Sequence, residues 1–445
     1  MPSDWKGLLA VIFLALAFIS IRFDEMLDFP DHKVIEPYGD GFKAYTVIYY
    51  HAKYDSTYSH YEGMNYPYGE HVVPGATQPI LSTTIKFISE HFTDITPYTF
   101  HLVHLLMLFS IFLCALFVYL IMRRLKTPAW YSVLIAIGLT FLAPQINRMH
   151  SHYGLAHPAV IPAVIYFLMR WHEAKHWRWS IYIMITVFCY SMIHFYYFAI
   201  LTFLVSFFFL FHILQEISWK RFQESAIHYT IQLLIPLAFF FWWMILNDPI
   251  PDRVSVPWGY LHYRAKWHGV FVSLVQPYFA WFHNKVHAFG WLDFENKAYL
   301  GLAGIGATAL LVYYWLSNRL KKGAIPFESE QSAFLNKLFY GSMVILLFSF
   351  GLPFILPGME SMIKYTGPIK QFRGIGRFVW VFYFVINVIG FASLYHWLKG
   401  KNWKPALFWP SLLLPCLILL FEAYNHTKAE DVRLDEIQEL KPGST

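Results

Sequence analysis

Acidic residues that could do chemistry gather in one stretch, 23–97, directly after the first apolar segment. Asp24 and Glu25 follow that segment at once, and Asp40 stands between two glycines further on. A carboxylate just outside a membrane helix can hold a divalent cation or act as a general base on a hydroxyl or amide acceptor. The flanking glycines let the backbone turn sharply and present Asp40 at the membrane surface. The simpler interpretation is that the acidic pair marks a helix end and that Asp40 lies in an ordinary turn.

The same stretch is rich in histidine and tyrosine. His60 lies among other histidines and carboxylates, ahead of the run Tyr66-Pro67-Tyr68-Gly69. Histidine with carboxylates is a common ligand set for transition metals, but the spacing typical of a helical metal site is missing here. Contact with a sugar, or a plain surface role, is therefore the better interpretation of these histidines.

A short connection between two later apolar segments carries the run Asn147-Arg148-Met149-His150-Ser151-His152. Ionisable residues this close to apolar segments are costly unless they line a wet cavity, so they are functional candidates. Arg148 with His150 suits a phosphate or pyrophosphate headgroup. The alternative is that both side chains only reach towards the lipid headgroups.

Composition identifies the elements that must position these residues. Of the 445 residues, 57% are hydrophobic and only 14% are charged, against about 25% charged in a soluble domain, which indicates an all-α polytopic membrane protein. The formal net charge of +6 comes from short basic clusters between apolar runs. Such clusters are topology signals, so we expect no nucleic-acid partner. All three cysteines fall inside apolar segments, which excludes a disulfide framework in the outer loops.

About eleven segments are apolar enough to span a membrane, at about 20 residues each. The stretch 180–214 has no polar break, and as one helix it would be roughly 50 Å long against a hydrocarbon core of about 30 Å. Two helices that turn near 194–198 fit better. The predicted helices cover residues 6–22, 99–122, 131–146, 155–171, 180–196, 198–214, 229–246, 298–316, 336–356, 376–397 and 405–423.

With two helices in 180–214, the basic clusters between helices all fall on one side of the membrane, as the positive-inside rule requires. We therefore expect a cytoplasmic N-terminus, with the first helix retained as an anchor because no cleavage site follows it. The large first loop and the C-terminus then lie outside. The outer loops are 23–97, 247–297 and 357–375, within a transmembrane domain of residues 1–424, and 425–445 is an extracytoplasmic tail or the stub of a further domain.

A third cluster then lies on the outer side, where Lys370 precedes Phe372-Arg373-Gly374-Ile375-Gly376-Arg377. Positive charge outside runs against the topological bias, and an anionic lipid or a sugar phosphate would account for it. Arg373 and Arg377 are four residues apart, so they share a face if a helix begins there. The alternative is a solvated interfacial anchor.

The combination of a cytoplasmic N-terminus, one helix, a large acidic outer loop and many further helices resembles the GT-C superfamily of membrane glycosyltransferases, which use polyprenyl-phosphate-linked sugars as donors. The resemblance covers most of the chain as architecture. Asp40 matches the loop aspartate that bacterial members place before a Tyr-Pro-x-Gly segment, here residues 66–69. Asp24 and Glu25 match the acidic pair that other members carry at the end of the first helix. We take Asp40 as the principal catalytic carboxylate and Asp24 as the second candidate.

The same resemblance suggests how the donor is held. Arg373 and Arg377, with Lys370, match a late outer loop that would bind the donor phosphate, and Arg148 with His150 matches a short loop near the lipid phosphate. The implied reaction is an inverting transfer of a hexose or pentose to a protein, lipid or glycan acceptor at the outer surface of a bacterial inner membrane. The residues expected to contact sugar or acceptor are His60, Tyr66, Tyr68, Trp258 and Tyr260.

A divalent metal, Mg or Mn, stays open as a cofactor, with Asp40 and Asp24 as its ligands. The first loop has no DxD or ExD motif, and metal-independent members of the superfamily exist.

Three other functions compete with this prediction. A transporter or flippase of lipid-linked sugars needs charged or broken helices at the bilayer midplane, whereas the centres of the predicted helices are nearly free of charge. An O-antigen-type polymerase would depend on arginines in large late loops more than on a first-loop aspartate. A non-catalytic assembly subunit would tolerate replacement of Asp40.

Overall fold

The computed structural model describes residues 5–28, 33–248, 250, 254, 258–272, 295, 297–321, 329–401, 403–429 and 435–436. Much of the predicted outer loop 247–297 and most of the predicted tail 425–445 therefore lie outside the described residues. The predicted boundary at 424 falls inside a helix that continues to Ala429.

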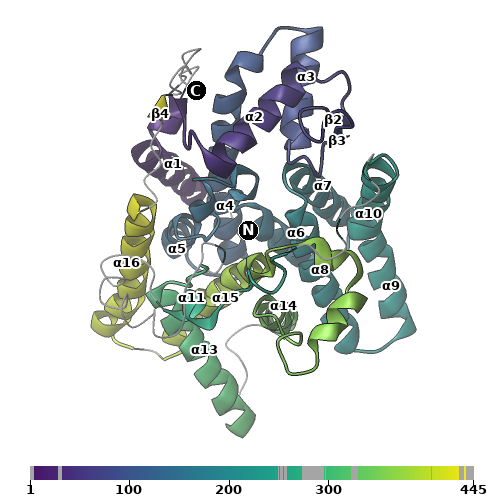
Figure 1. Cartoon of the computed structure of the whole chain (residues 1–445). Helices are drawn as coiled ribbons and strands as arrows, with labels where there is room; N and C mark the ends of the chain where they lie inside the picture. The colour runs from purple at the N-terminus through teal and green to yellow at the C-terminus, as the bar shows by residue number, and fades with distance from the viewer. Residues whose placement is uncertain are drawn as a thin grey trace.

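The described chain is mostly helical (Figure 1). The α-helices are α1 (Trp5–Arg22), α2 (Gly39–Lys53), α3 (Pro79–His91), α4 (Thr99–Arg124), α5 (Ala129–Phe141), α6 (Val160–Ala174), α7 (Trp177–Ile193), α8 (Tyr196–Leu214), α9 (Trp219–Tyr229), α10 (Ile235–Phe240), α11 (Trp267–Phe271), α13 (Leu302–Lys321), α14 (Ser329–Ser349), α15 (Val379–Gly400) and α16 (Pro405–Ala429). Shorter 3₁₀ turns include η1 (Glu25–Leu27), η3 (Ile146–Arg148), η4 (Tyr153–Leu155) and η11 (Ile375–Phe378).

Extended structure is confined, in the described part, to two small antiparallel pairs. Strand β1 (Lys33–Val34) pairs with β4 (Asp435–Glu436), and β2 (His60–Tyr61) pairs with β3 (Glu70–His71). The first pair joins the first outer loop to the C-terminal segment. The second folds the His/Tyr-rich part of that loop back on itself.

The helices agree with the prediction of a polytopic all-α membrane protein. Each of the eleven predicted segments coincides with helical structure, and nine of the described helical stretches are long and apolar enough to cross a membrane. Helix α7 has only 17 residues, and the described apolar part of α13 is shorter than a full span. Helix α15 is buried along nearly its whole length and forms the centre of the bundle.

The predicted break in 180–214 is confirmed. Helix α7 ends at Ile193, and α8 begins at Tyr196. Between them His194 has an extended backbone, with φ −155° and ψ 122°. The chain therefore reverses direction here, as expected where one straight helix would be too long for the bilayer.

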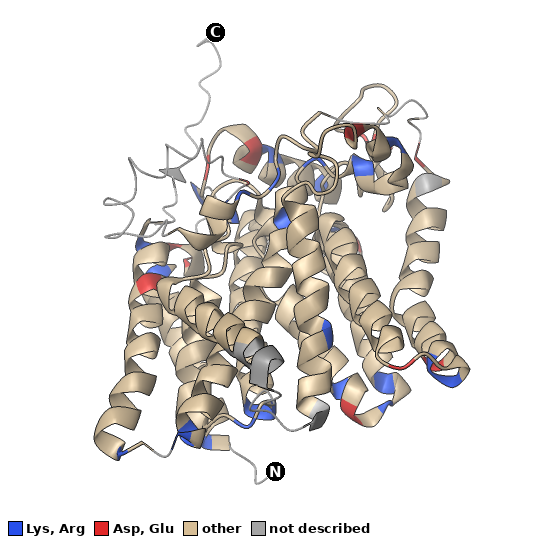
Figure 2. Ribbon diagram, turned by 90° about the horizontal axis from the view of Figure 1, so that it is seen from below, with Lys and Arg blue, Asp and Glu red and all other residues tan. Residues whose placement is uncertain are grey.

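Several of the predicted basic clusters meet at one end of the bundle, where Lys and Arg colour the lower helix ends in Figure 2. Arg124 binds Glu173 across the α4 and α6 ends at 3.1 Å. Lys175, at the end of α6, binds Glu224 on α9 at 3.4 Å. The α15 end joins the same group, because His396 hydrogen-bonds the Leu125 carbonyl at 2.7 Å.

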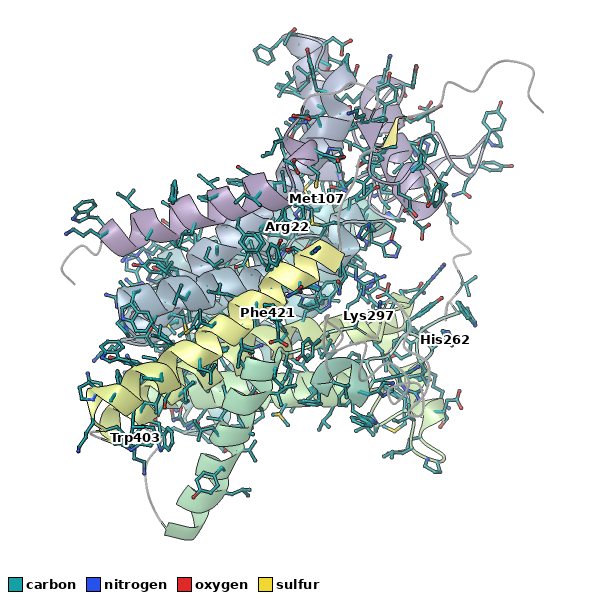
Figure 3. The ribbon with its side chains drawn as sticks, turned by 90° about the vertical axis from the view of Figure 1, so that its left-hand side faces the viewer. Arg22, Met107, His262, Lys297, Trp403 and Phe421 are labelled. Carbon is teal, nitrogen blue, oxygen red and sulfur yellow. The ribbon has the colours of Figure 1, made fainter. Side chains whose placement is uncertain are left out.

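At this same end of the bundle lies Trp403, just before α16, while Arg22 at the end of α1 lies towards the other end (Figure 3). The Arg22 guanidinium donates to the Thr427 carbonyl at 3.2 Å, which fixes α1 against α16. His262 and Lys297, from the described parts of the segment 258–297, lie at the end away from Trp403 (Figure 3).

The first outer loop folds into α2 and α3, which pack against each other outside the bundle (Figure 1). Tyr45 anchors α2, because its buried ring packs on Tyr153 with centroids 4.6 Å apart and its hydroxyl lies 2.5 Å from His104 Nε2 on α4. Helix α2 is therefore held rigidly against the bundle, and its first turn carries Asp40.

Candidate functional site

Five ionisable side chains form a connected group, the ion cluster: Asp40, Arg148, His152, Glu295 and Arg377. Arg377 donates from Nε to Glu295 Oε2 at 2.9 Å and from Nη2 to Oε1 at 2.5 Å. Arg148 Nη2 lies 3.0 Å from Glu295 Oε2. The side chains of Arg148, Glu295 and Arg377 are only 1%, 9% and 10% exposed, so a buried carboxylate joins two buried guanidiniums.

His152 connects this buried group to the surface. Its Nε2 lies 3.8 Å from Glu295 Oε1, and its Nδ1 lies 4.0 Å from Asp40 Oδ2. The Asp40 side chain is 70% exposed. The cluster thus runs from an accessible carboxylate, through a partly covered imidazole, to the buried arginines.

The first turn of α2 positions Asp40. Gly39 starts the helix with φ +62°, a conformation that favours glycine. The Gly41 amide donates to Glu36 Oε2 at 3.0 Å, and a Cβ at Gly41 would clash with Glu36 and with the Tyr153 hydroxyl. An acidic residue in a first turn is favoured by the helix dipole. The glycines around Asp40 thus allow the turn and the close packing that hold its carboxylate beside His152.

Neighbouring helices hold Arg148. It ends the 3₁₀ turn η3, and its guanidinium lies 5.7 Å from the ring centre of Trp380 on α15. The preceding residue, Asn147, is tied to His426 on α16 by a hydrogen bond of 2.8 Å. Together with Glu295, α15 and α16 therefore hold this turn from three segments that are distant in sequence.

The segment 372–377 is held as tightly. The Gly374 amide donates to the Tyr196 hydroxyl at 2.7 Å, and the Gly376 amide donates to the Tyr263 carbonyl at 2.9 Å. The Arg377 guanidinium lies 4.2 Å from the centre of the Tyr196 ring, a cation–π contact that compensates part of the cost of burying its charge.

Electrostatics keep the Glu295 carboxylate ionised. Burial acts to raise the pKa of the Glu295 carboxyl, but the charges of Arg377 and Arg148 outweigh it and lower the pKa to about 2. Burial lowers the pKa of His152, and the charge of Arg377 adds to that effect. His152 is therefore neutral near pH 7, and the buried Arg–Glu–Arg part carries one excess positive charge.

Glu295 is the residue that the sequence prediction missed. It follows Asp293 in the aromatic run Trp291-Leu292-Asp293-Phe294-Glu295 and matches no motif. The one usable signal was the excess of outer-side arginines, each of which needs an anion when buried.

Arg373 and Arg377 do not share a helical face. Arg373 precedes η11 and is exposed, whereas Arg377 lies within it and is buried against Glu295. The 3₁₀ turn η11 begins two residues after Arg373, at Ile375, and α15 begins only at Val379, so the four-residue spacing does not align the two side chains. Lys370 and His150 are half-buried.

The acidic pair Asp24–Glu25 occupies a different part of the first loop. Asp24 and Glu25 follow the end of α1 at η1, where the neighbouring Phe23 and Met26 are buried in the core. Asp24 is exposed and Glu25 half-buried. The structure thus brings Asp40, Arg148 and Arg377 together through Glu295 and His152, and the acidic pair stands at the helix end.

The aromatic candidates divide by exposure. Tyr66, Tyr68 and Trp258 are 90%, 75% and 71% exposed, so their rings are open to a sugar. Tyr260 is buried beside Phe354, with ring centres 6.0 Å apart, so a sugar cannot reach its ring in this structure. His60 is half-buried in β2.

The described residues of the site do not fit a divalent cation. No group of three or more His, Cys, Asp or Glu side chains with metal-binding geometry occurs within the described ranges. Both oxygens of Glu295 already bind guanidiniums, and two nearby guanidiniums would repel a dication. Among the described residues, Asp40 and His152 form only a pair of possible ligands, and Asp24 belongs to no group of three.

Comparison with known protein families identifies the family of this chain. The model of the family described as "Domain of unknown function (DUF6311)" matches residues 10–420. The chain belongs to the DUF6311 family. No curated protein matches it.

Solved structures resemble the DUF6311 chain in fold. The apo crystal structure of the Archaeoglobus fulgidus oligosaccharyltransferase aligns with a TM-score of 0.55 at 14% identity, over 98% of this chain and 57% of that one. The same organism's oligosaccharyltransferase AglB, in complex with an inhibitory peptide and a dolichol-phosphate, aligns with a TM-score of 0.51 at 12% identity over the same shares. The chain thus spans little more than half the length of these structures. The predicted GT-C architecture of a multi-pass membrane protein is confirmed.

Proposed function

We propose that this DUF6311 protein is a glycosyltransferase that moves a sugar from a polyprenyl-phosphate-linked donor to an acceptor at the membrane face that carries α2 and α3. One observation carries the proposal: the exposed carboxylate of Asp40 lies 4.0 Å from His152, above a buried Arg–Glu–Arg group with an excess positive charge. This arrangement offers a base for the acceptor beside a place for an anionic leaving group. The GT-C fold supports it.

In the proposed reaction, Asp40 removes the proton of an acceptor hydroxyl or amide. The acceptor then attacks the anomeric carbon, and the bond from that carbon to the phosphate oxygen breaks with its electron pair on the departing polyprenyl phosphate. Arg373, which is exposed, and Lys370 bind this phosphate. The buried arginines act through their field and by holding the segment 372–377 in place.

The routes by which the donor and the acceptor reach the site follow from which residues are exposed. A lipid-linked donor arrives laterally from the bilayer, and the exposed rings of Tyr66, Tyr68 and Trp258 stack on the sugar or acceptor from the aqueous side. The archaeal AglB structure holds both a peptide and a dolichol-phosphate, which supports a lipid phosphate as leaving group and admits a peptide among the acceptors. We place the reaction at the outer face of a bacterial inner membrane, with the N-terminus cytoplasmic and the C-terminus extracytoplasmic.

A transfer assay tests the proposal. Purified full-length protein is incubated with radiolabelled polyprenyl-phosphate sugars and a total membrane and envelope-protein extract, and the labelled product is measured. Asp40→Asn is expected to reduce the rate by about 100-fold or more, because a positioned base contributes about that much. Asp28→Asn, a matched control at an exposed aspartate of the same loop, is expected to keep the rate.

Each other outcome contradicts part of the proposal. Loss of product with Asp24→Asn but not with Asp40→Asn moves the base to the end of α1. Absence of product from folded wild-type protein with every donor overturns the function. Movement of the intact labelled donor across proteoliposome membranes would then identify a flippase.

A further inference from the structure

A polar cavity lies at the far end of the bundle from the ion cluster. It has a volume of about 540 Å³ and lies among the ends of α6, α8 and α9 and the first turns of α14. Helix α8 separates the two sites. Tyr196, at the start of α8, accepts a hydrogen bond from Gly374 beside the ion cluster. His212, near the end of α8, lines the cavity. The 19 residues of α8 span roughly 28 Å. The residues that matter here are His172, Lys175, His212, Glu216, Arg221 and Lys337.

Lys337 is the unusual member of this cavity. Its side chain lies on α14 and the residue is only 3% exposed. Within the described ranges no carboxylate pairs with its ammonium, and the nearest charges acting on it are the cations Lys175 and Arg221. A buried ammonium beside like charges is costly, and an anion in the cavity would remove that cost.

The other two cations have partners, but their partners do not neutralise the cavity. Arg221 binds Glu216, and Lys175 lies 3.4 Å from Glu224. The described groups therefore include one more cation than carboxylates. Lys337 is the one of these three cations that has no carboxylate partner among the described residues.

Two histidines supply polar atoms with no partner in the described structure. His212 Nε2 lies 3.3 Å from the Lys175 ammonium, which can only donate, so Nε2 accepts and the neutral ring carries its proton on Nδ1. His212 Nδ1 is buried and makes no hydrogen bond to any described residue, and the same holds for His172 Nδ1. The His212 residue is 4% exposed. A buried N–H without a described acceptor is costly. The residue that carries it, His212, lines the same cavity as Lys337.

We propose that this cavity binds a phosphate group. An ammonium without a counter-ion and an imidazole N–H without an acceptor, among the described residues, are donors that a phosphate oxygen takes. The cavity is at the end where the basic clusters gather, in the region of lipid headgroups, so the phosphate belongs either to an anionic phospholipid or to a free phosphate compound. The site is at the opposite end of the bundle from the proposed transfer reaction, and its occupancy is independent of the donor site.

The test measures binding to the full-length protein in dodecyl maltoside micelles. One arm titrates inorganic phosphate, and the other adds phosphatidylglycerol to the micelles, with sodium chloride and phosphatidylcholine as the matched controls. Thermal midpoint and equilibrium binding are both recorded. For wild type we expect a rise in midpoint with phosphate or phosphatidylglycerol and not with the controls, and Lys337→Gln should weaken binding by roughly tenfold or more.

A matched variant separates this site from general charge effects. Lys399→Gln removes one positive charge from an exposed lysine at the same end of the bundle, and it should bind as wild type does. Without added anion, Lys337→Gln should unfold at a higher temperature than wild type, because it removes the unpaired buried charge. His212→Asn, which keeps a small polar donor, should lose less affinity than His212→Phe.

The outcomes identify the source or overturn the site. A response to inorganic phosphate alone identifies a free phosphate compound, and a response to phosphatidylglycerol alone identifies a lipid headgroup. No response to either probe, or equal binding by wild type and Lys337→Gln, overturns the proposal. The glycosyltransferase proposal stands or falls separately, because its assay follows Asp40.

Discussion

Arg377 and Glu295 lie 82 residues apart in the sequence and form two side-chain hydrogen bonds in the interior. Arg148 binds the same carboxylate at 3.0 Å. These contacts of Glu295 tie the turn η11, just before α15, to the segment that carries Glu295 and to the short turn η3 after α5. The geometry beneath Asp40 therefore depends on a single carboxylate.

Replacing Glu295 should destabilise the protein strongly. Glu295→Ala leaves two buried guanidiniums facing each other without an anion, which costs on the order of 3–5 kcal/mol. The measurement is the free energy or thermal midpoint of unfolding in detergent.

The control for that variant is Glu360→Gln, at an exposed glutamate of the outer loop before α15. It should change the unfolding midpoint very little. If Glu295→Ala were as stable as this control, the ion cluster would not hold the fold together.

Acid should destabilise the protein through Glu295. Its pKa falls from an ordinary value of 4.5 to about 2 in the folded state, so the unfolded chain binds the proton first. The stabilisation is complete above pH 4.5 and is lost as the pH falls towards 2. Burial lowers the pKa of His152 as well, which removes further stability below that group's ordinary pKa of 6.5.

Unfolding midpoints measured between pH 7 and 2.5 check this prediction. Glu295→Gln cannot titrate, so its midpoint should fall less over the lower half of that range than the wild-type midpoint does. Parallel curves for the two proteins would show that Glu295 is not the titrating group.

Arg373 and Arg377 should fail in different ways when replaced. Arg373 is exposed, so Arg373→Gln should leave the unfolding midpoint unchanged and raise the KM for the lipid donor by roughly tenfold, because one charge-assisted contact to phosphate is lost. Arg377→Gln should lower the midpoint, because it leaves Glu295 with Arg148 alone. Steady-state kinetics and thermal unfolding of both variants separate the two roles, and equal effects on stability would contradict them.

Gly376→Ala should distort the site by overpacking. A Cβ at Gly376 would lie 2.9 Å from the Glu295 carbonyl oxygen and 3.0 Å from the backbone of both Tyr263 and Ala265. Backbone atoms cannot rotate away, so the expected cost is about 1–3 kcal/mol. Chemical or thermal unfolding in detergent measures it.

Gly306 on α13 is the matched control for that substitution. An added Cβ there meets nothing within 4 Å, and alanine in a helix is favoured over glycine by about 0.5–1 kcal/mol. Gly306→Ala should therefore be neutral or stabilising. A similar loss of stability in both variants would mean that the crowding at Gly376 is not the cause.

The membrane architecture was predictable because it follows from local composition. Each spanning helix needs a continuous apolar run, and each turn in a bundle interrupts one. Even the break between α7 and α8 could be inferred, because one helix over 180–214 would be longer than the bilayer is thick. The folding of 23–97 into α2 and α3 was not foreseen, since these amphipathic helices carry no comparable apolar run.

The candidate site was only half predictable. Asp40, Arg148 and Arg377 stood out because charges and glycines are rare beside apolar runs. Glu295 did not, because what makes it important is contact with residues far away in the sequence. His152 lay in the same polar run as Arg148, but its place between Asp40 and Glu295 depends on the fold. The spacing of Arg373 and Arg377 was misleading, since the helix starts after Arg373.

The sequence by itself thus determined that the chain crosses a membrane many times, where it turns, and which end of the bundle is basic, because these properties depend on runs of neighbouring residues. Tertiary structure alone decided which charges meet. A buried ion pair forms only where two distant segments exclude water around it. This is why the pairing of Glu295 with two arginines, and the burial of Lys337 without a described carboxylate partner at the opposite end, became visible only in the folded protein.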